Sequence, residues 1–356
     1  MEEWKNSEKE PLKQPLKQPP PTRQKNSLVA GKKTEVKKPP FNVGGEAVIE
    51  GVMMRSPHFY AVSVRSQTGK ITTTSDRVNS ASDKYPFFKW PFLRGLLSMY
   101  ESMSLGFKAL SYSAAIYEKE AEKKDAPKNV PSKKSNEAID LTLSFSLAII
   151  LAIGLFILLP YGLNKLLARK FPEISTNRYL FNTGMVFFKL LIFFFYVWGI
   201  SFFEDVKRLF MYHGSEHKSI YAFEDGKKLD FKNISPYSTR HPRCGTAFII
   251  ATLIISLIIF VLCLPAQLNP LQRIIFEIPL LIPIIAISYE LLKLSDKFRD
   301  NPLMKIVIAP GLAFQRLTTK EPDKKMVEVA VKSLETVVKL EMAWIKKQPR
   351  SKQVKK

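Results

Sequence analysis

Four long apolar stretches constrain this chain more than any other feature of its sequence. Each is rich in Leu, Ile, Phe and Val, and they lie at about residues 140–163, 180–203, 246–265 and 271–293. A helix needs roughly 20 apolar residues to cross the hydrocarbon core of a bilayer, which is about 30 Å thick. The sequence therefore predicts a mainly α membrane protein with four transmembrane helices. Only a few residues join the third and fourth spans, so we expect these two to form a tight antiparallel pair.

The distribution of Lys and Arg predicts the orientation of these spans. Basic residues crowd the segment before the first span, the stretch 204–245 and the C-terminal tail, whereas the connection between the third and fourth spans is nearly uncharged. Four cations between the first and second spans, Lys165, Arg169, Lys170 and Arg178, weaken this contrast. Because cationic loops stay on the cytoplasmic side, we expect a multi-pass protein of the cytoplasmic (inner) membrane with both termini in the cytoplasm.

The net charge of +22 predicts anionic partners. The cations are spread over tails and loops beside apolar spans, so the lipid bilayer and its anionic headgroups are favoured, and no specific nucleic acid is expected. A protein partner on the cytoplasmic side stays an open alternative. The two cysteines, Cys244 and Cys263, do not support a disulfide framework.

The polar regions outside the spans divide by composition. Residues 1–40 are basic and proline-rich, which predicts a disordered basic tail, and residues 347–356 form a second basic tail. Residues 41–90 predict a small β-rich cytoplasmic element. Within it, two alternating β-branched runs, Tyr60–Arg65 and Lys70–Ser75, are separated by a short glycine-containing segment, which is typical of a hairpin.

Apolar residues at three- and four-residue spacings predict amphipathic cytoplasmic helices. One is expected over residues 91–117, either at the membrane surface or docked against the transmembrane bundle. A charged linker, 118–139, separates it from the four-helix transmembrane region, 140–293. Residues 294–346 return to a soluble character and predict a cytoplasmic helical region.

A histidine-containing stretch follows the second span. We expect that span to continue as one helix through Glu204–Glu224, which places His213 and His217 one turn apart on the same side. With Glu216, these residues fit the H-x-x-E-H pattern of one class of zinc hydrolases, in which the histidines bind zinc and the glutamate activates water. The alternative is a polar interfacial helix whose histidines make ordinary hydrogen bonds.

A second polar stretch, Ser238–Thr246, returns to the membrane before the third span and adds His241 and Cys244 to the candidate site. Three histidines and a water would leave an open catalytic position, whereas a Cys244 thiolate as fourth ligand would close the shell and indicate a structural site. The competing interpretation is a hydrogen-bonded loop that ties two helices together, with Arg243 at a lipid phosphate. The fourth histidine, His58, is expected to be a surface or turn residue.

Ionisable residues also occur inside the spans. Lys189 lies near the middle of the second span, where a charge is costly unless it faces a partner or a wet cavity. Glu277 and Glu290, near the two ends of the fourth span, are the candidate partners, and Asn182 adds a further polar group. Snorkelling of Lys189 towards the interface is the alternative.

Six motifs carry a family resemblance. They are VGGEAVIEGVMMRSP, PFLRGL, YHGSEHKSIYAFE, STRHPRCGTAF, ISYELLKLSD and NPLMKIVIAPGLAFQRLTTKEPD, in this order. Together they make residues 41–346 resemble the YqhQ-like family of bacterial membrane proteins, whose function is unassigned and whose members are often labelled metal-dependent enzymes. The family pattern carries over onto His213, Glu216, His217, His241 and Cys244. Members often have Gln where this chain has Glu46, so a role for that side chain as a neutral amide does not transfer.

Two function classes follow from these observations. The first is a membrane protein with a divalent metal ion, zinc being favoured, at the cytoplasmic face, acting as a metal-dependent hydrolase. His213, His217, His241 and Cys244 would then be ligands, and Glu216 the general base. The second is a non-enzymatic membrane scaffold or biogenesis factor that engages a partner complex through its basic cytoplasmic face. A transporter that uses Lys189 and Glu277 is a third, weaker hypothesis.

Overall fold

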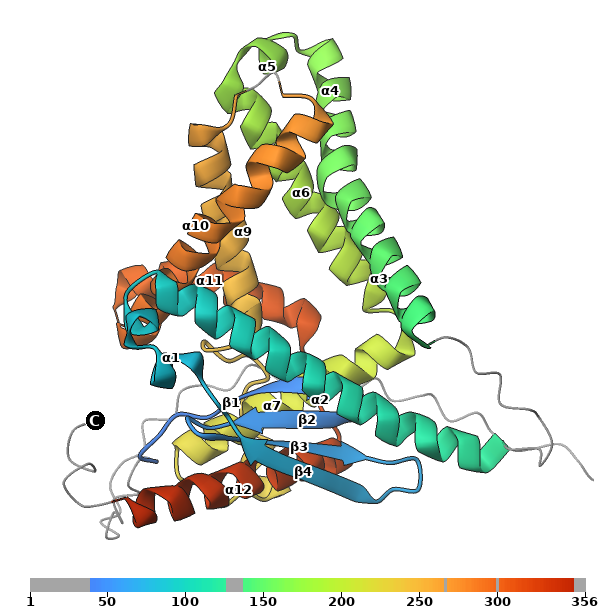
Figure 1. Cartoon of the computed structure of the whole chain (residues 1–356), viewed down its shortest axis with the longest axis vertical. Coiled ribbons are helices and arrows are strands. Elements are labelled where there is room, and N and C mark those ends of the chain that lie inside the picture. The colour runs from blue at the N-terminus through green and yellow to red at the C-terminus, as the bar shows by residue number, and fades with distance from the viewer. Residues whose placement is uncertain (1–38, 126–136, 266–267, 299–300, 349–356) are drawn as a thin grey trace, which may run out of the picture. The chain divides into compact units, whose positions relative to one another are not determined.

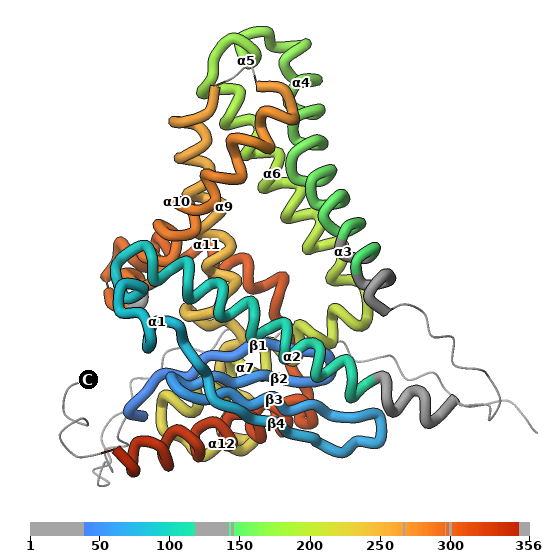
Figure 2. The backbone as a smooth tube through the Cα atoms, in the orientation of Figure 1, coloured from blue at the N-terminus to red at the C-terminus, as the bar shows by residue number. Residues whose placement is uncertain are grey.

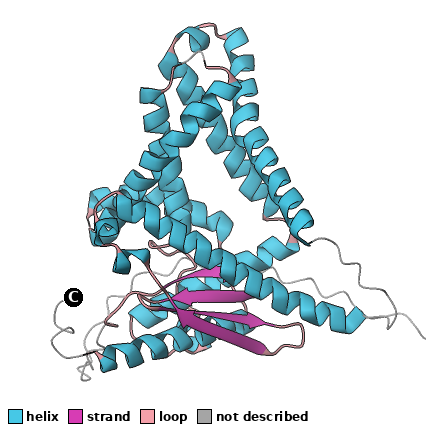
Figure 3. Cartoon of the chain, in the orientation of Figure 1, coloured by secondary structure: helices cyan, strands magenta, loops and turns pink. Residues whose placement is uncertain are grey.

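The computed structural model describes residues 39–125, 137–265, 268–298 and 301–348. Most of these residues are helical, and the strands gather in one small sheet near the N-terminal end of the described chain (Figure 3). The disordered tail predicted for residues 1–40 and the tail predicted for 347–356 fall mostly outside the described residues, so they stay predictions. Of the linker predicted for 118–139, residues 126–136 lie outside the described residues, whereas 118–125 continue the helix α2 (Leu93–Asp125) and 137–139 begin the helix α3 (Glu137–Ile153).

The sheet is an antiparallel meander of β1 (Gly44–Val48), β2 (Gly51–Arg55), β3 (Phe59–Arg65) and β4 (Ile71–Arg77), in the order β1-β2-β3-β4 (Figure 2). The predicted hairpin is β3–β4, in which Val62 pairs with Thr74. Its turn contains Gly69 at φ +86°, a left-handed conformation that costs glycine no steric strain.

Both faces of the sheet are covered, which explains why consecutive residues of β2 and β3 are buried. Val52, Met54 and Ala61 point to one face, where they pack with the apolar sides of α7 (Glu204–Glu224) and α12 (Lys324–Lys347). Met53 and Val62 point to the opposite face, where α2 (Leu93–Asp125) lies across the strands (Figure 1). A four-stranded sheet this small needs such helix packing for its stability.

Four long apolar helices form the rest of the core, and each is long and apolar enough to cross a membrane. The first combines α3 (Glu137–Ile153), a π-helical turn η2 (Gly154–Leu158) and α4 (Leu159–Lys170). The others are α6 (Arg178–Ile200), α9 (Gly245–Cys263) and α10 (Pro270–Lys297). Their outer surfaces expose many Leu, Ile and Phe side chains, as a lipid environment requires.

Shorter helices connect these parts. They are α1 (Ala81–Lys84), the 3-10 helix η1 (Pro86–Lys89), α5 (Glu173–Thr176), α8 (Phe231–Ile234) and α11 (Pro302–Thr318). Helix α11 packs its Gly311 directly against Ala247 at the start of α9, where a Cβ on the glycine would lie 3.0 Å from Ala247 Cα.

The predicted fold class is confirmed: a mainly helical chain with four long apolar helices and a small N-terminal antiparallel sheet. One expectation about its detail was wrong. The second span does not run on as a single helix, because α6 ends at Ile200 and α7 begins at Glu204 after an extended Phe203. This break lets α7 leave the direction of the span and pack on the sheet.

Candidate metal centre

Helix α7 carries the two predicted histidines into the interior. Its central residues from Gly214 to Ile220 are all buried between β1, β2 and α12. His213 and His217 lie one turn apart with ring centroids 4.4 Å from each other. Gly214 lies between them, and its lack of a side chain makes room for the backbone of Lys320: a Cβ at Gly214 would lie 2.0 Å from the carbonyl oxygen of Lys320. The glycine therefore costs some helix propensity but permits the close packing that buries the site.

Backbone carbonyl groups fix the orientation of both rings. Nδ1 of His213 lies 2.9 Å from the carbonyl oxygen of Thr318, and Nδ1 of His217 contacts the carbonyl oxygen of Thr239. A carbonyl can only accept, so each Nδ1 donates its hydrogen, and Nε2 is the nitrogen left to bind an ion. This is the arrangement usual for metal-binding histidines, whose second nitrogen is anchored by an oxygen acceptor.

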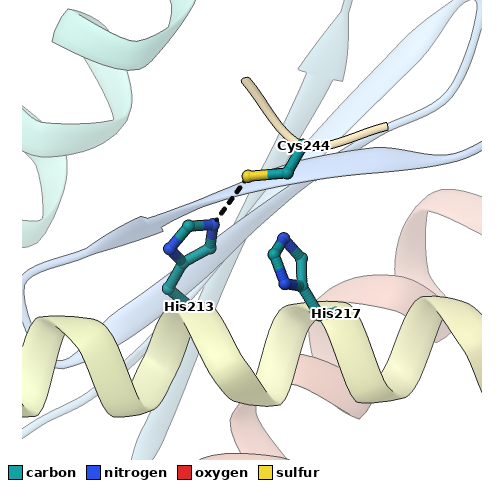
Figure 4. Close-up of side chains that lie close together, drawn as sticks. All are labelled: His213, His217 and Cys244. Atoms are coloured by element: carbon teal, nitrogen blue, oxygen red, sulfur yellow. Dashed lines mark hydrogen bonds between the residues drawn. The ribbon is translucent and has the colours of Figure 1, made fainter. Parts of the chain in front are cut away.

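Cys244 supplies the third group. It is the residue that caps α9, immediately before the third apolar helix, and its Sγ lies 3.1 Å from Nε2 of His213 (Figure 4). One ring nitrogen of each histidine and this sulfur all lie within 4.8 Å of one another. A tetrahedral zinc with bonds of about 2.0–2.3 Å would hold such atoms about 3.5 Å apart. Small side-chain movements would therefore suffice, and the three residues could hold a metal ion.

The burial of His217 suits this role. Burial lowers the pKa of His217, and the Cys244 thiol beside it offsets part of that effect. The imidazole is therefore neutral near pH 7, as a metal ligand must be. Its Nε2 is buried and lies beside the Cys244 thiol and Oε2 of Glu216. A buried nitrogen that faces a sulfur and a carboxylate is suited to holding a metal ion.

Glu216 lies next to this triad, on the side that faces the sheet. Glu216 is 4% exposed, and its carboxyl group accepts a hydrogen bond from the backbone N–H of Gly45 and places Oε2 3.4 Å from Nε2 of His217. Gly45 makes room for it, since a Cβ there would lie 2.8 Å from Glu216 Cγ. Burial raises the pKa of Glu216, and the nearby His213 and His241 oppose this effect.

His241 is close to the triad without being one of its three members. Its ring centroid is 5.8 Å from that of His217, and its Nδ1 accepts a hydrogen bond from the backbone N–H of Arg243. Its backbone is held on both sides by Gln315, which accepts from the His241 N–H at 2.7 Å and donates to its carbonyl oxygen at 2.9 Å.

Glu224 completes the surroundings of His241. Its Oε1 lies 3.7 Å from Nε2 of His241 and pairs with the guanidinium group of Arg243. The structure thus places Arg243 at a carboxylate of its own chain. Sequence analysis missed Glu224, although it lies seven residues after His217 and hence on the same side of a helix. The carbonyl groups of Thr239 and Thr318 carry no sequence signal, because every residue has one.

A separate polar cluster joins the apolar helices. Nζ of Lys189 on α6 lies 2.5 Å from Oε2 of Glu277 on α10, and Nη1 of Arg273 lies 3.6 Å from Oε1 of the same carboxylate. Arg273, only 1% exposed, donates to Oδ1 of Asn182 at 3.0 Å, and Asn182 donates to the carbonyl oxygen of Leu264 at 2.7 Å. One carboxylate therefore faces two cations. Sequence analysis missed Arg273, which precedes Glu277 by one helical turn.

The other two predicted polar residues have partners elsewhere. Glu290 binds Arg94 of α2 through a contact of 2.8 Å between Oε1 and Nε. His58 lies between β2 and β3, where its Nδ1 is 2.7 Å from Oε1 of the buried Glu341 and its ring stacks on Trp344 of α12. His58 thus joins the sheet to α12.

Comparisons with known proteins place the chain in a family. Residues 90–340 match the model of a family described as "Protein of unknown function (DUF1385)". The chain belongs to this family. It is also 32% identical, over 311 residues, to the "Uncharacterized protein YqhQ" of Bacillus subtilis, a match that covers 85% of this chain and 94% of the relative. The predicted YqhQ-like resemblance is confirmed. No solved structure matches the chain.

Proposed function

We propose that this chain is a multi-pass membrane protein that binds one divalent metal ion through His213, His217 and Cys244. One observation carries the proposal: both histidines donate Nδ1–H to backbone carbonyl groups, which leaves Nε2 available beside the Cys244 sulfur. Two imidazoles and a thiolate are a donor set that zinc accepts readily. Zinc is therefore the metal we expect.

Three protein ligands favour a reactive site over a closed structural one. If His213, His217 and Cys244 hold zinc, the ion would have room for a water or substrate and would supply a water whose pKa is lowered to about 7. Glu216 would be the residue placed to accept a proton from that water, because its Oε2 lies 3.4 Å from Nε2 of His217, the nitrogen that would hold the ion. His241, whose ring centroid is 5.8 Å from that of His217, and its partner Glu224 lie close to the three ligands.

The reaction class that fits this arrangement is metal-dependent hydrolysis next to a membrane. Cys244 directly precedes an apolar helix that is long enough to cross a bilayer. This position next to a candidate span favours a substrate that is anchored in the membrane. The charge distribution of the chain favours the cytoplasmic side.

The test separates binding from chemistry. Glu216→Gln should keep the metal content of the wild-type protein and lose hydrolysis of chromogenic ester, phosphoester or peptide probes, whereas His213→Ala should lose both. Cobalt substitution adds a second readout, since a thiolate ligand gives cobalt a charge-transfer absorption in the near ultraviolet. Wild-type protein that stays free of metal after reconstitution with zinc, manganese or iron would contradict the proposal. It would favour the alternative function, a non-enzymatic membrane scaffold.

A further inference from the structure

Helix α2 is apolar on two opposite faces, and only one of them is covered by the sheet. Leu105 and Ala109 are buried against Met53 and Val62 of the sheet. The close fit continues at Gly106, where a Cβ would lie 2.5 Å from Oε2 of Glu46. This face is accounted for by the fold.

The opposite face, which we call the free face, consists of Tyr100, Met103, Phe107 and Leu110. These side chains are 72%, 65%, 64% and 42% exposed, respectively. Their spacing of three and four residues makes one stripe, and at about 100° per residue it lies across the helix from Leu105 and Ala109. Contiguous apolar surface of this kind marks a site of contact with another molecule or a membrane.

The start of α2 is fastened to the end of a candidate span. Arg94 donates from Nε to Oε1 of Glu290 at 2.8 Å, and the backbone N–H of Phe92 donates to the same oxygen at 3.1 Å. Gly95 packs on Tyr289: a Cβ added at Gly95 would lie 2.8 Å from the Cβ of Tyr289. Glu290 and Tyr289 belong to the last turns of the span Pro270–Ser295. The first turn of α2 therefore lies close to the end of this candidate span.

The residues around this attachment have the composition of an interfacial segment. Tyr85, Phe87, Trp90 and Phe92 precede α2, and all are exposed. Aromatic side chains concentrate where hydrocarbon meets water, because their rings are apolar and the indole N–H and phenol O–H can stay hydrated. Exposed lysines flank them, at Lys84, Lys89 and Lys108, and suit the anionic headgroups of such a surface.

We infer that α2 lies in the membrane interface, with its free face in contact with lipid and its opposite face on the sheet. The occupant of the free face is thus the bilayer that the same chain spans, because the attachment to α10 brings the helix to that surface. Figure 1 shows α2 between the sheet and the long helices. The sheet with α7 would in this way be held beneath the membrane surface, independently of whether the triad binds metal.

Depth-dependent quenching tests this inference in the full chain, reconstituted in liposomes that contain phosphatidylglycerol. A fluorophore is attached to Phe107→Cys in a Cys263→Ser background, and a matched label is attached to Glu335→Cys on the exposed side of α12. Signal from the buried Cys244 is subtracted with the unsubstituted background protein. Lipids that carry a nitroxide near the headgroup should quench the label at 107 severalfold more than the label at 335.

Three results would overturn the inference. Equal quenching at both positions, or stronger quenching at 107 by a water-soluble agent than by nitroxide lipid, would show that the free face is in water. Energy transfer between labels at 107 on two copies, without lipid quenching, would assign the face to a second copy of the chain. If Phe107→Cys does not fold, Met103→Cys provides the same measurement on the same face.

Discussion

Replacing Glu46 by glutamine should stabilise the protein in a pH-dependent way. Glu46 lies on β1 opposite Met53, with its carboxyl group against Gly106 of α2. Burial raises the pKa of Glu46 from 4.5 to about 7, the charge of Glu216 adds to this, and Arg55 opposes it. A glutamine has the same shape and no proton to lose.

The magnitude follows from this pKa. A tenfold change in proton affinity corresponds to about 1.4 kcal/mol, so ionised Glu46 costs the folded state up to about 3 kcal/mol. Between pH 4.5 and about 7 the folded protein keeps a proton that the unfolded chain has released, and the free energy of unfolding therefore falls as the pH rises. The advantage of Glu46→Gln should be small near the lower end of this window and complete above about pH 7.5.

Thermal unfolding of the purified chain in detergent, at a fixed scan rate, provides the assay. Above about pH 7.5 the midpoint of Glu46→Gln should exceed that of the wild type by on the order of 5 °C, and the two should converge as the pH falls towards 5. Glu335→Gln, at an exposed position of α12, is the matched control and should give no pH-dependent difference. A constant difference for Glu46→Gln at every pH, or a loss of stability at high pH, would refute the reasoning.

Three further predictions test the packing, the polar cluster and the orientation. Gly214→Ala should lower stability by about 1–3 kcal/mol, since its Cβ would lie 2.0 Å from a carbonyl oxygen, while Gly162→Ala, with open space around it, should be harmless in the same thermal assay. Glu277→Leu should destabilise the protein more than Lys189→Leu, because it leaves two buried cations without their carboxylate. Equal effects would contradict the interpretation that Lys189 and Arg273 share the carboxylate of Glu277. A cysteine at Lys228 should resist an impermeant thiol reagent in intact cells, and its labelling would reverse the predicted topology.

Hydropathy alone predicted the four long helices, because a span of hydrocarbon demands length and composition rather than particular partners. The β3–β4 hairpin was likewise predictable from local alternation and its turn. The break between α6 and α7 was not predictable from the sequence, because Ser201–Phe203 carries no proline or glycine. The packing of α7 on the sheet, a contact between segments far apart in sequence, decides where the helix must turn.

The candidate site shows the same division. The spacing of His213 and His217 on one helix was readable from the sequence, and Cys244 was a candidate because it immediately precedes a span. The position of His241 depends on Gln315, more than 70 residues away, which holds its backbone. The partner of Glu290 depends on α2, so sequence analysis could name the carboxylate but could not find Arg94. Contacts between residues far apart in the sequence leave no local sequence pattern.

The metal content of a single matched pair of variants tests the central claim most directly. Cys244→Ser and Cys263→Ser change the two cysteines of the chain, one buried beside the histidines and one exposed at the end of an apolar helix. After purification without chelator, elemental mass spectrometry should find about one metal ion per chain in the wild type and in Cys263→Ser, and a large loss in Cys244→Ser. Equal metal content in the two variants, or none in any of the three proteins after reconstitution, would contradict a metal centre at His213, His217 and Cys244.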